Sequence, residues 1–175
     1  MSWLGLILVV ISCLLYLWHR SSLWLGVGLA ISFSFDALDG ALARAQGTVS
    51  KFGGYLDAVV DRYQEVIAFL VIAGVTGWWV VSFLAVTGSL LTSYNKARVA
   101  VEMPVDNKGW PDLLERPQRV VLLIGGLVLD SAIPLPQLLG GRFLYLILGV
   151  LAVGTHVTAI QRFLRARRML EGTPP

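Results

Sequence analysis

The chain has 175 residues, of which 56% are hydrophobic and only 14% are charged, and its formal net charge is +3. Soluble domains are about one quarter charged and less than half apolar, so a soluble enzyme, a disordered tail and a nucleic-acid-binding domain are poor fits. The apolar residues lie in long blocks, and most lysines and arginines lie between the blocks. The pattern predicts an all-α integral membrane protein surrounded by membrane lipids, with no nucleic-acid partner.

Six transmembrane helices are expected, because a helix needs about 20 residues to cross the hydrocarbon core. In chain order they are predicted at 3–18, 23–45, 49–75, 80–94, 120–129 with about one more turn at each end, and 143–160. The third holds Asp57, Asp61, Arg62 and Glu65 before its apolar part, so a hydropathy window would detect only its second half, from residue 66 to 75. Prolines mark connecting segments at 102–115 and 130–142. Residues 1–175 form a single predicted domain, with a cytoplasmic tail from about 166 onward.

The basic residues predict the topology. Of the 14 lysines and arginines, Arg62 lies inside the third span, and only Arg20 and Arg142 fall on one side of the membrane. The other eleven share the opposite side: Arg44, Lys51, Lys96, Arg98, Lys108, Arg116, Arg119, Arg162, Arg165, Arg167 and Arg168. By the positive-inside rule, both termini are expected to be cytoplasmic in a multi-pass protein of the cell membrane. We interpret the four arginines at 162–168 as lipid-headgroup anchors.

Four aspartates lie within the predicted spans, where carboxylates are costly and mark function. Asp36 and Asp39 are three residues apart and Asp57 and Asp61 are four apart, so each pair shares one helix face. Both pairs lie near the cytoplasmic ends of consecutive spans joined by a short loop near Gly47, so the hairpin is expected to bring the four carboxylates together. Two divalent cations would balance their charge, and oxygen ligands without His or Cys suit Mg²⁺ or Mn²⁺.

The residues between the acids fit a substrate that carries a diphosphate. Gly40 and Ala43 leave the helix surface bare beside the acids, and Gly53 clears similar space one turn before Asp57. Arg44 supplies a planar guanidinium suited to phosphate oxygens. Small residues can also serve close helix packing. That alternative does not explain the carboxylates.

The whole segment from Asp36 to Asp61 has the pattern D-x2-D-G-x2-A-R-x8-G-x3-D-x3-D. It resembles the CDP-alcohol phosphotransferase family without a mismatch. The resemblance implies a homodimeric membrane enzyme that transfers the phospholipid moiety of a CDP-linked lipid, CDP-diacylglycerol or CDP-archaeol, to a polar alcohol and releases CMP. Members usually carry an amphipathic cytoplasmic segment before the first span, whereas the first span here is expected to begin at about residue 3.

The motif assigns roles residue by residue. By resemblance, Asp61 is also the general base that takes the proton of the attacking hydroxyl. The implied ligands of two divalent metals are Asp36, Asp39, Asp57 and Asp61. The implied contacts of the CDP-lipid are Asp39, Gly40, Ala43, Arg44 and Gly53. Glu65, one further turn along the same face, is interpreted as a structural partner for an arginine.

Two segments indicate the acceptor alcohol. Residues 93–98 and 114–119 resemble the branch of the family that makes phosphatidylinositol phosphate or archaetidylinositol phosphate from inositol 1-phosphate, although Gln118 stands where a Glu is expected. The resemblance implies that the acceptor phosphate is bound by Ser93, Lys96, Arg98, Arg116 and Arg119. The alternative interpretation is that these basic residues serve only the membrane topology, through the positive-inside rule. Glycerol 3-phosphate is the alternative acceptor.

Two other classes of protein also place carboxylates in membrane helices. An intramembrane prenyltransferase binds a diphosphate through Asp-rich helices and Mg²⁺, and a divalent-cation carrier could use the same acids without catalysis. Neither requires a Gly, an Arg and a second Gly at these intervals. Release of CMP from a labelled CDP-lipid distinguishes the three, and the sequence leaves diacyl and ether lipid tails equally open.

Overall fold

The computed structural model describes residues 2–47, 50–103, 113–133 and 142–172, without the side chains of Ser2, Asp39, Ala43 and Arg44. Within these ranges the chain forms six α-helices, which confirms the all-α class. They are α1 (Ser2–His19), α2 (Ser22–Ala45), α3 (Lys51–Thr76), α4 (Trp79–Glu102), α5 (Arg116–Leu129) and α6 (Phe143–Leu170). Most of the two predicted connecting segments, including Lys108, lies outside the described residues, as does the predicted start of the third span at Val49.

Two helices differ in length from the sequence prediction. The fourth continues about two turns beyond Tyr94 to Glu102, since no proline occurs before Pro104, so the segment 93–98 is helical. The fifth helix has the additional turn that was expected at its start, but the prediction of an additional turn at its end is wrong. It stops at Leu129, whose carbonyl accepts from the backbone N–H groups of Ala132 and Ile133 at 3.0 Å each in a tight turn.

Local capping fixes the two ends of α3. The Ser50 hydroxyl accepts a hydrogen bond from the Gly53 N–H at 2.9 Å and caps the start. At the other end Gly77 adopts a left-handed conformation (φ 79°) and donates its N–H to the Ala73 carbonyl, which closes the helix. The caps set Asp57 and Asp61 in the second and third turns of α3.

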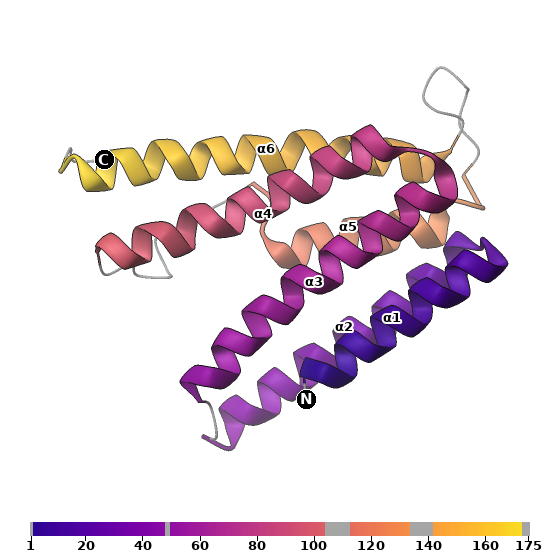
Figure 1. Ribbon diagram of the computed structural model, residues 1–175, viewed down its shortest axis with the longest axis horizontal. Helices are drawn as coiled ribbons and strands as arrows, with labels where there is room; N and C mark the ends of the chain where they lie inside the picture. The colour runs from indigo at the N-terminus through magenta and orange to yellow at the C-terminus, as the bar shows by residue number, and fades with distance from the viewer. Residues whose placement is uncertain (1, 48–49, 104–112, 134–141, 173–175) are drawn as a thin grey trace.

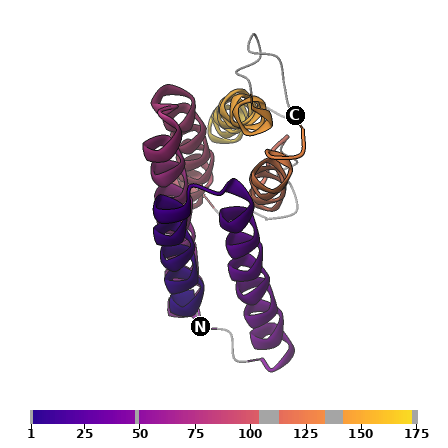
Figure 2. The same cartoon turned by 90° about the vertical axis from the view of Figure 1, so that its right-hand side faces the viewer.

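The helices pack in pairs that close a ring in the order α1, α3, α4, α6, α5, α2 and back to α1. Figure 1 shows α4 and α6 running side by side above α1 and α2, and Figure 2 shows from one end that α2 and α5 lie opposite α1, α3 and α4. The interior of the ring is apolar toward the ends where α3 and α5 finish, with Leu25, Ile72 and Leu127 among its fully buried side chains. Toward the ends where α3 and α5 begin, the interior is lined by buried polar residues such as Gln64, Glu65 and Arg119.

Two of the described helices are long and apolar enough to cross a membrane, at Ser22–Leu42 and Phe143–Leu170, and α1 contributes a shorter apolar helix at Trp3–His19. The outward surface carries many large apolar side chains, such as Trp24, Val80 and Phe83. A surface of this kind is unfavourable in water and favourable in lipid.

The apolar end of the ring is tied by one buried carboxylate. Asp130 Oδ1 accepts from the Leu144 N–H at 2.9 Å, and its Oδ2 accepts from the Ser22 hydroxyl at 3.1 Å and from Arg142. Arg142 also lies over the Trp78 ring, with 5.4 Å from Cζ to the ring centroid. Asp130 therefore joins one end each of α2, α5 and α6 at a single point.

Candidate active site

Asp36 lies on α2 where that helix packs against α1 and faces α3. Its Oδ2 accepts a hydrogen bond from Gln64 Nε2 of α3 at 2.9 Å. On the other side, a Cβ at Gly5 of α1 would overlap the Asp36 carboxylate, so only glycine leaves room for it there. The backbone of the same glycine accepts a hydrogen bond from Ser32 at 2.7 Å, which holds α1 close to α2.

On α3, Asp57 is exposed and Asp61, one turn further, is only 8% exposed. Beside Asp57 the helix surface is open: a Cβ at Gly54 would meet no atom within 4 Å, and one at Gly53 would approach only the Ser50 hydroxyl. Space of this kind suits a ligand that lies against the backbone. The role assigned to Gly53 stays a prediction.

The predicted metal ligands are oxygen donors on two neighbouring helices, and their chemistry fits Mg²⁺ or Mn²⁺. Among the described side chains, no three His, Cys, Asp or Glu groups come together as one metal-binding set. The predicted set includes Asp39, whose side chain lies outside the described part, as do those of Ala43 and Arg44. The convergence of the four carboxylates stays a prediction.

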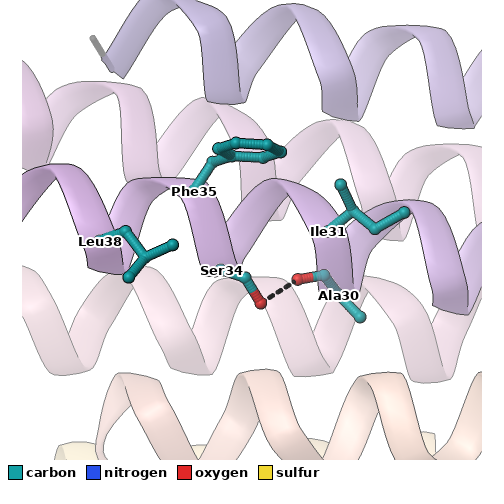
Figure 3. A pocket seen from close by; sticks show the side chains of 5 residues that line it. All are labelled: Ala30, Ile31, Ser34, Phe35 and Leu38. Carbon is teal, nitrogen blue, oxygen red and sulfur yellow. Dashed lines mark hydrogen bonds between the residues drawn. The ribbon is translucent and has the colours of Figure 1, made fainter.

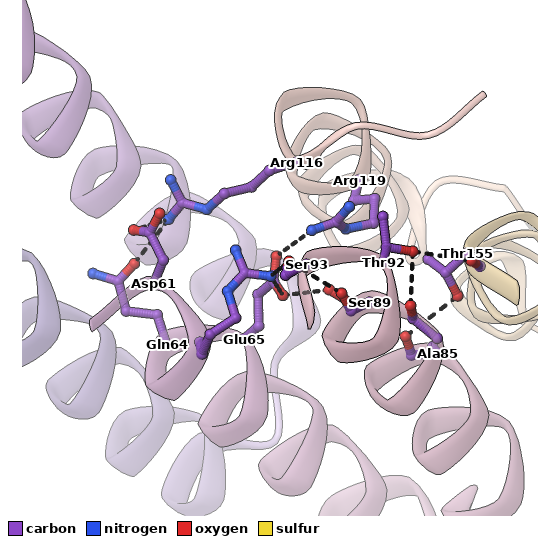
Figure 4. A network of polar contacts seen from close by, with 12 residues as sticks. Asp61, Gln64, Glu65, Ala85, Ser89, Thr92, Ser93, Arg116, Arg119 and Thr155 are labelled. Atoms are coloured by element: carbon purple, nitrogen blue, oxygen red, sulfur yellow. Dashed lines mark hydrogen bonds and ion pairs between the residues drawn. The ribbon is translucent and has the colours of Figure 1, made fainter. Parts of the chain in front are cut away.

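Arg116, the first residue of α5, reaches into this region from the opposite side (Figure 4). Its Nη2 atom lies 2.5 Å from Asp61 Oδ1 and donates to Gln64 Oε1 at 3.3 Å. The guanidinium also stacks over the ring of Phe33 on α2, 5.4 Å from its centroid. One arginine thus contacts α2 and α3 and pairs with the predicted general base.

Glu65 is the centre of a second cluster, deeper in the ring (Figure 4). It accepts hydrogen bonds from Arg62 at 2.9 Å, from Arg119 at 3.1 Å and from the Ser89 hydroxyl. Arg62 donates in addition to Ser93 Oγ at 2.7 Å. The interpretation of Glu65 as a structural partner for arginine is confirmed.

The structure separates the five predicted acceptor-binding residues. Arg116 is partly exposed and pairs with Asp61, while Arg119 is only 6% exposed and is held by Glu65 and by the Leu114 carbonyl. Ser93 and Lys96 share one face of α4, but Arg98 comes five residues after Ser93, about 140° around the helix. Arg98 is half exposed and pairs with Glu102 at 2.5 Å.

Two of the buried polar residues near the site that sequence reasoning did not place in the interior are Gln64 and Arg162. Gln64 is fully buried, and its position three residues after Asp61 on the same face was the available signal. The second is Arg162, whose interpretation as a headgroup anchor is wrong: it is 8% exposed and donates to the Thr92 carbonyl at 2.6 Å. It continues a stripe of buried polar residues on α6 with Thr155 and Thr158, at spacings of three and four.

An apolar groove of about 340 Å³ runs along the outer face of α2, lined by Ala30, Ile31, Ser34, Phe35 and Leu38 (Figure 3). The hydroxyl of Ser34 donates to the Ala30 carbonyl at 2.7 Å, so it offers no free donor to a ligand. The groove and Asp36 belong to the same helix, but they lie on opposite faces of it. Its lining suits hydrocarbon.

Comparison with known proteins agrees with the motif. Residues 1–163 match the CDP-alcohol phosphatidyltransferase family. The chain is 34% identical over 149 residues to the archaetidylinositol phosphate synthase of Pyrococcus horikoshii, covering 83% of this chain and 71% of that protein.

The fold is similar to that of the phosphatidylinositol phosphate synthase of Mycobacterium tuberculosis with CDP-DAG bound, with a TM-score of 0.79 and 25% identity over 94% of this chain and 83% of that one. A structure of the same enzyme with manganese and citrate gives a TM-score of 0.78 at 25% identity, over 95% and 80% of the two chains. The chain therefore belongs to the CDP-alcohol phosphatidyltransferase family of enzymes.

Proposed function

We propose that the protein transfers the phospholipid moiety of a CDP-linked lipid, CDP-diacylglycerol or CDP-archaeol, to inositol 1-phosphate and releases CMP. The observation that carries this proposal is the ion pair between Asp61, the last acid of the motif, and Arg116, a residue of the segment that resembles the inositol phosphate branch. The pair joins the proposed base to a cation suited to the acceptor phosphate. The names of the similar proteins, an archaetidylinositol phosphate synthase and a phosphatidylinositol phosphate synthase, support the same acceptor.

The reaction is a displacement at phosphorus. The acceptor hydroxyl forms a new bond to the phosphorus that carries the lipid, the bond from that phosphorus to the CMP phosphate breaks, and Asp61 takes the proton of the hydroxyl. Two divalent cations, Mg²⁺ or Mn²⁺, would supply polarisation of the diphosphate when bound. Their proposed ligands are Asp36, Asp39, Asp57 and Asp61, and the manganese complex of the similar Mycobacterium tuberculosis enzyme supports a divalent metal.

The remaining motif residues bind the donor. We assign Asp39, Gly40, Ala43, Arg44 and Gly53 to the cytidine diphosphate, and the apolar groove on the outer face of α2 suits a lipid tail. For the acceptor phosphate we assign Ser93, Lys96, Arg98, Arg116 and Arg119. Arg116 is the best placed of these, because it already lies against Asp61.

The enzyme is proposed to be a homodimer of six-span subunits in the cytoplasmic membrane, with both termini and the active site on the cytoplasmic side. The distribution of eleven basic residues against two supports this topology. The apolar outer surface of helices such as α4 agrees with a lipid environment.

The test is a product assay on the purified protein with labelled CDP-diacylglycerol and CDP-archaeol. Inositol 1-phosphate, glycerol 3-phosphate, serine and free inositol are offered separately with Mg²⁺ or Mn²⁺. We expect CMP and lipid product in equal amounts with inositol 1-phosphate. Product with glycerol 3-phosphate alone would reassign the acceptor. Absence of CMP release with every acceptor would contradict the proposed reaction.

A further inference from the structure

Gln64 lies between the two halves of the proposed site and belongs to neither the motif nor the acceptor segments. It is fully buried on α3. Its Nε2 donates to Asp36 Oδ2 at 2.9 Å, and its Oε1 accepts from Arg116 Nη2 at 3.3 Å. The side chain thus connects α2 with α5 through α3.

The two ends of a glutamine amide differ chemically, and here each end has the complementary partner. A carboxylate can only accept a hydrogen bond and a guanidinium can only donate one. With Arg116 on the oxygen side, the nitrogen must face Asp36, so a single amide orientation satisfies both contacts. A polar group buried in this way is rigid, because any rotation would leave a buried donor or acceptor unsatisfied.

We propose that Gln64 is a positioning residue that fixes the carboxylate of Asp36 for the divalent cation and aligns it with the Arg116 guanidinium for the acceptor phosphate. The inference rests on the proposed function, in which Asp36 is a metal ligand and Arg116 binds the acceptor. Side chains that orient metal ligands in this way change metal affinity or activity by about 10- to 100-fold when they are replaced.

The first test is Gln64→Met, which keeps the length and unbranched shape of the side chain but removes both hydrogen bonds. Mn²⁺ binding to the purified protein is measured by electron paramagnetic resonance without substrates. We expect the Mn²⁺ affinity to fall about tenfold. The same change in an Asp36→Asn background should have little further effect on Mn²⁺ affinity, because the carboxylate that Gln64 positions as a ligand is already absent.

The second test measures the KM for the acceptor, inositol 1-phosphate, at saturating Mn²⁺ and CDP-lipid. Gln64→Met should raise the KM for inositol 1-phosphate several-fold. Gln64→Glu should raise it about tenfold or more, because the new carboxylate holds Arg116 by a charge-assisted bond that the acceptor must break. Gln161→Met and Gln161→Glu, at an exposed position of α6, are the matched controls and should leave both quantities unchanged.

A purely structural role predicts a different result. Thermal unfolding would shift in the Gln64 variants while Mn²⁺ affinity and the acceptor KM stayed at wild-type values, and that outcome would overturn the inference. So would a tenfold loss of Mn²⁺ affinity that is equally large in the Asp36→Asn background. A wild-type protein that binds no Mn²⁺ and releases no CMP would instead overturn the proposed function, so the two failures are distinguishable.

Discussion

Arg116 pairs with Asp61 across the boundary between α5 and α3, with 2.5 Å between Nη2 and Oδ1. The arginine is the first residue of α5, and the aspartate is the last acid of the motif, 55 positions earlier in the chain. In the proposed function, the acceptor phosphate and the base would therefore share one cation. Binding of the acceptor and activation of its hydroxyl are therefore expected to depend on the same side chain.

Metal dependence is the first expected outcome. Excess chelator should abolish turnover, and Asp57→Asn should lose metal binding and turnover together, because an amide is a far weaker ligand for Mg²⁺ or Mn²⁺ than a carboxylate. Mn²⁺ titration and CMP release measure the two quantities. Glu171→Gln, which makes the same chemical change at the exposed end of α6, is the control. Full activity in excess chelator would contradict the metal mechanism.

Asp61→Asn separates catalysis from binding. The loss of a general base is expected to lower kcat by about two decades or more. CDP-lipid binding at saturating Mn²⁺ should change far less, since the other motif residues are intact. Single-turnover kinetics and equilibrium binding of a labelled CDP-lipid provide the comparison. Near-normal turnover in this variant would remove Asp61 from the role of base.

The acceptor arginines should differ in effect. Arg116→Gln is expected to raise the acceptor KM by one to two decades, since a charge-assisted hydrogen bond contributes about 1.5–3 kcal/mol. Arg98→Gln should have a smaller effect, because Arg98 points away from Ser93 and pairs with Glu102. The KM for the CDP-lipid should change little in either variant. Equal increases in the acceptor KM for both variants would show that Arg98 also faces the acceptor.

Glu65→Gln should reduce stability strongly. Glu65 is buried and accepts from Arg62, Arg119 and Ser89, so its neutralisation leaves the buried Arg119 and the partly buried Arg62 without their counter-charge. Breaking a buried ion pair in this way costs about 3–5 kcal/mol. Glu102→Gln breaks an exposed pair and should cost about 1 kcal/mol or less. Thermal unfolding in detergent compares the two, and equal Tm values would contradict the structural role of Glu65.

Gly5→Ala should weaken the metal site from a different helix. The added methyl group would overlap the Asp36 carboxylate, which must rotate away from its position. We expect a several-fold loss of Mn²⁺ affinity with little change in Tm, because the side chain that moves is short and only half-buried. Gly74→Ala, where a Cβ meets no atom within 4 Å, is the matched control. An unchanged Mn²⁺ affinity in Gly5→Ala would mean that Asp36 tolerates the shift.

The sequence was sufficient to predict the helices and the motif, because hydrophobic blocks and the spacing of Asp36 to Asp61 are local properties. It also predicted that Glu65 pairs with arginine, since the carboxylate continues the face of Asp61 into an apolar segment. The pairing of Arg116 with Asp61, and not of Arg98, depends on the order of helices around the ring. That order is not a local property.

Arg162 is a second residue whose surroundings could not be predicted from its charge and position alone. Its charge and its place near the end of the sixth span are typical of a headgroup anchor, yet it faces inward and donates to the Thr92 carbonyl. Counting charges cannot reveal this direction. The periodicity of Thr155, Thr158 and Arg162 could have done so, because three polar residues on one stripe of an apolar helix indicate a polar interior.

The buried Asp130 anchors one end of α2, so a small tilt of that helix at the anchor becomes a larger displacement at its other end. It holds the start of α2 through Ser22, and Asp36 lies 14 residues further along the same helix, about 21 Å away at 1.5 Å per residue. A tilt of about 3° at that anchor would displace Asp36 by about 1 Å, a misplacement that can cost an enzyme about 100-fold in rate. Asp130→Asn is thus expected to lower the reaction rate through a shift of Asp36, although residue 130 makes no contact with Asp36.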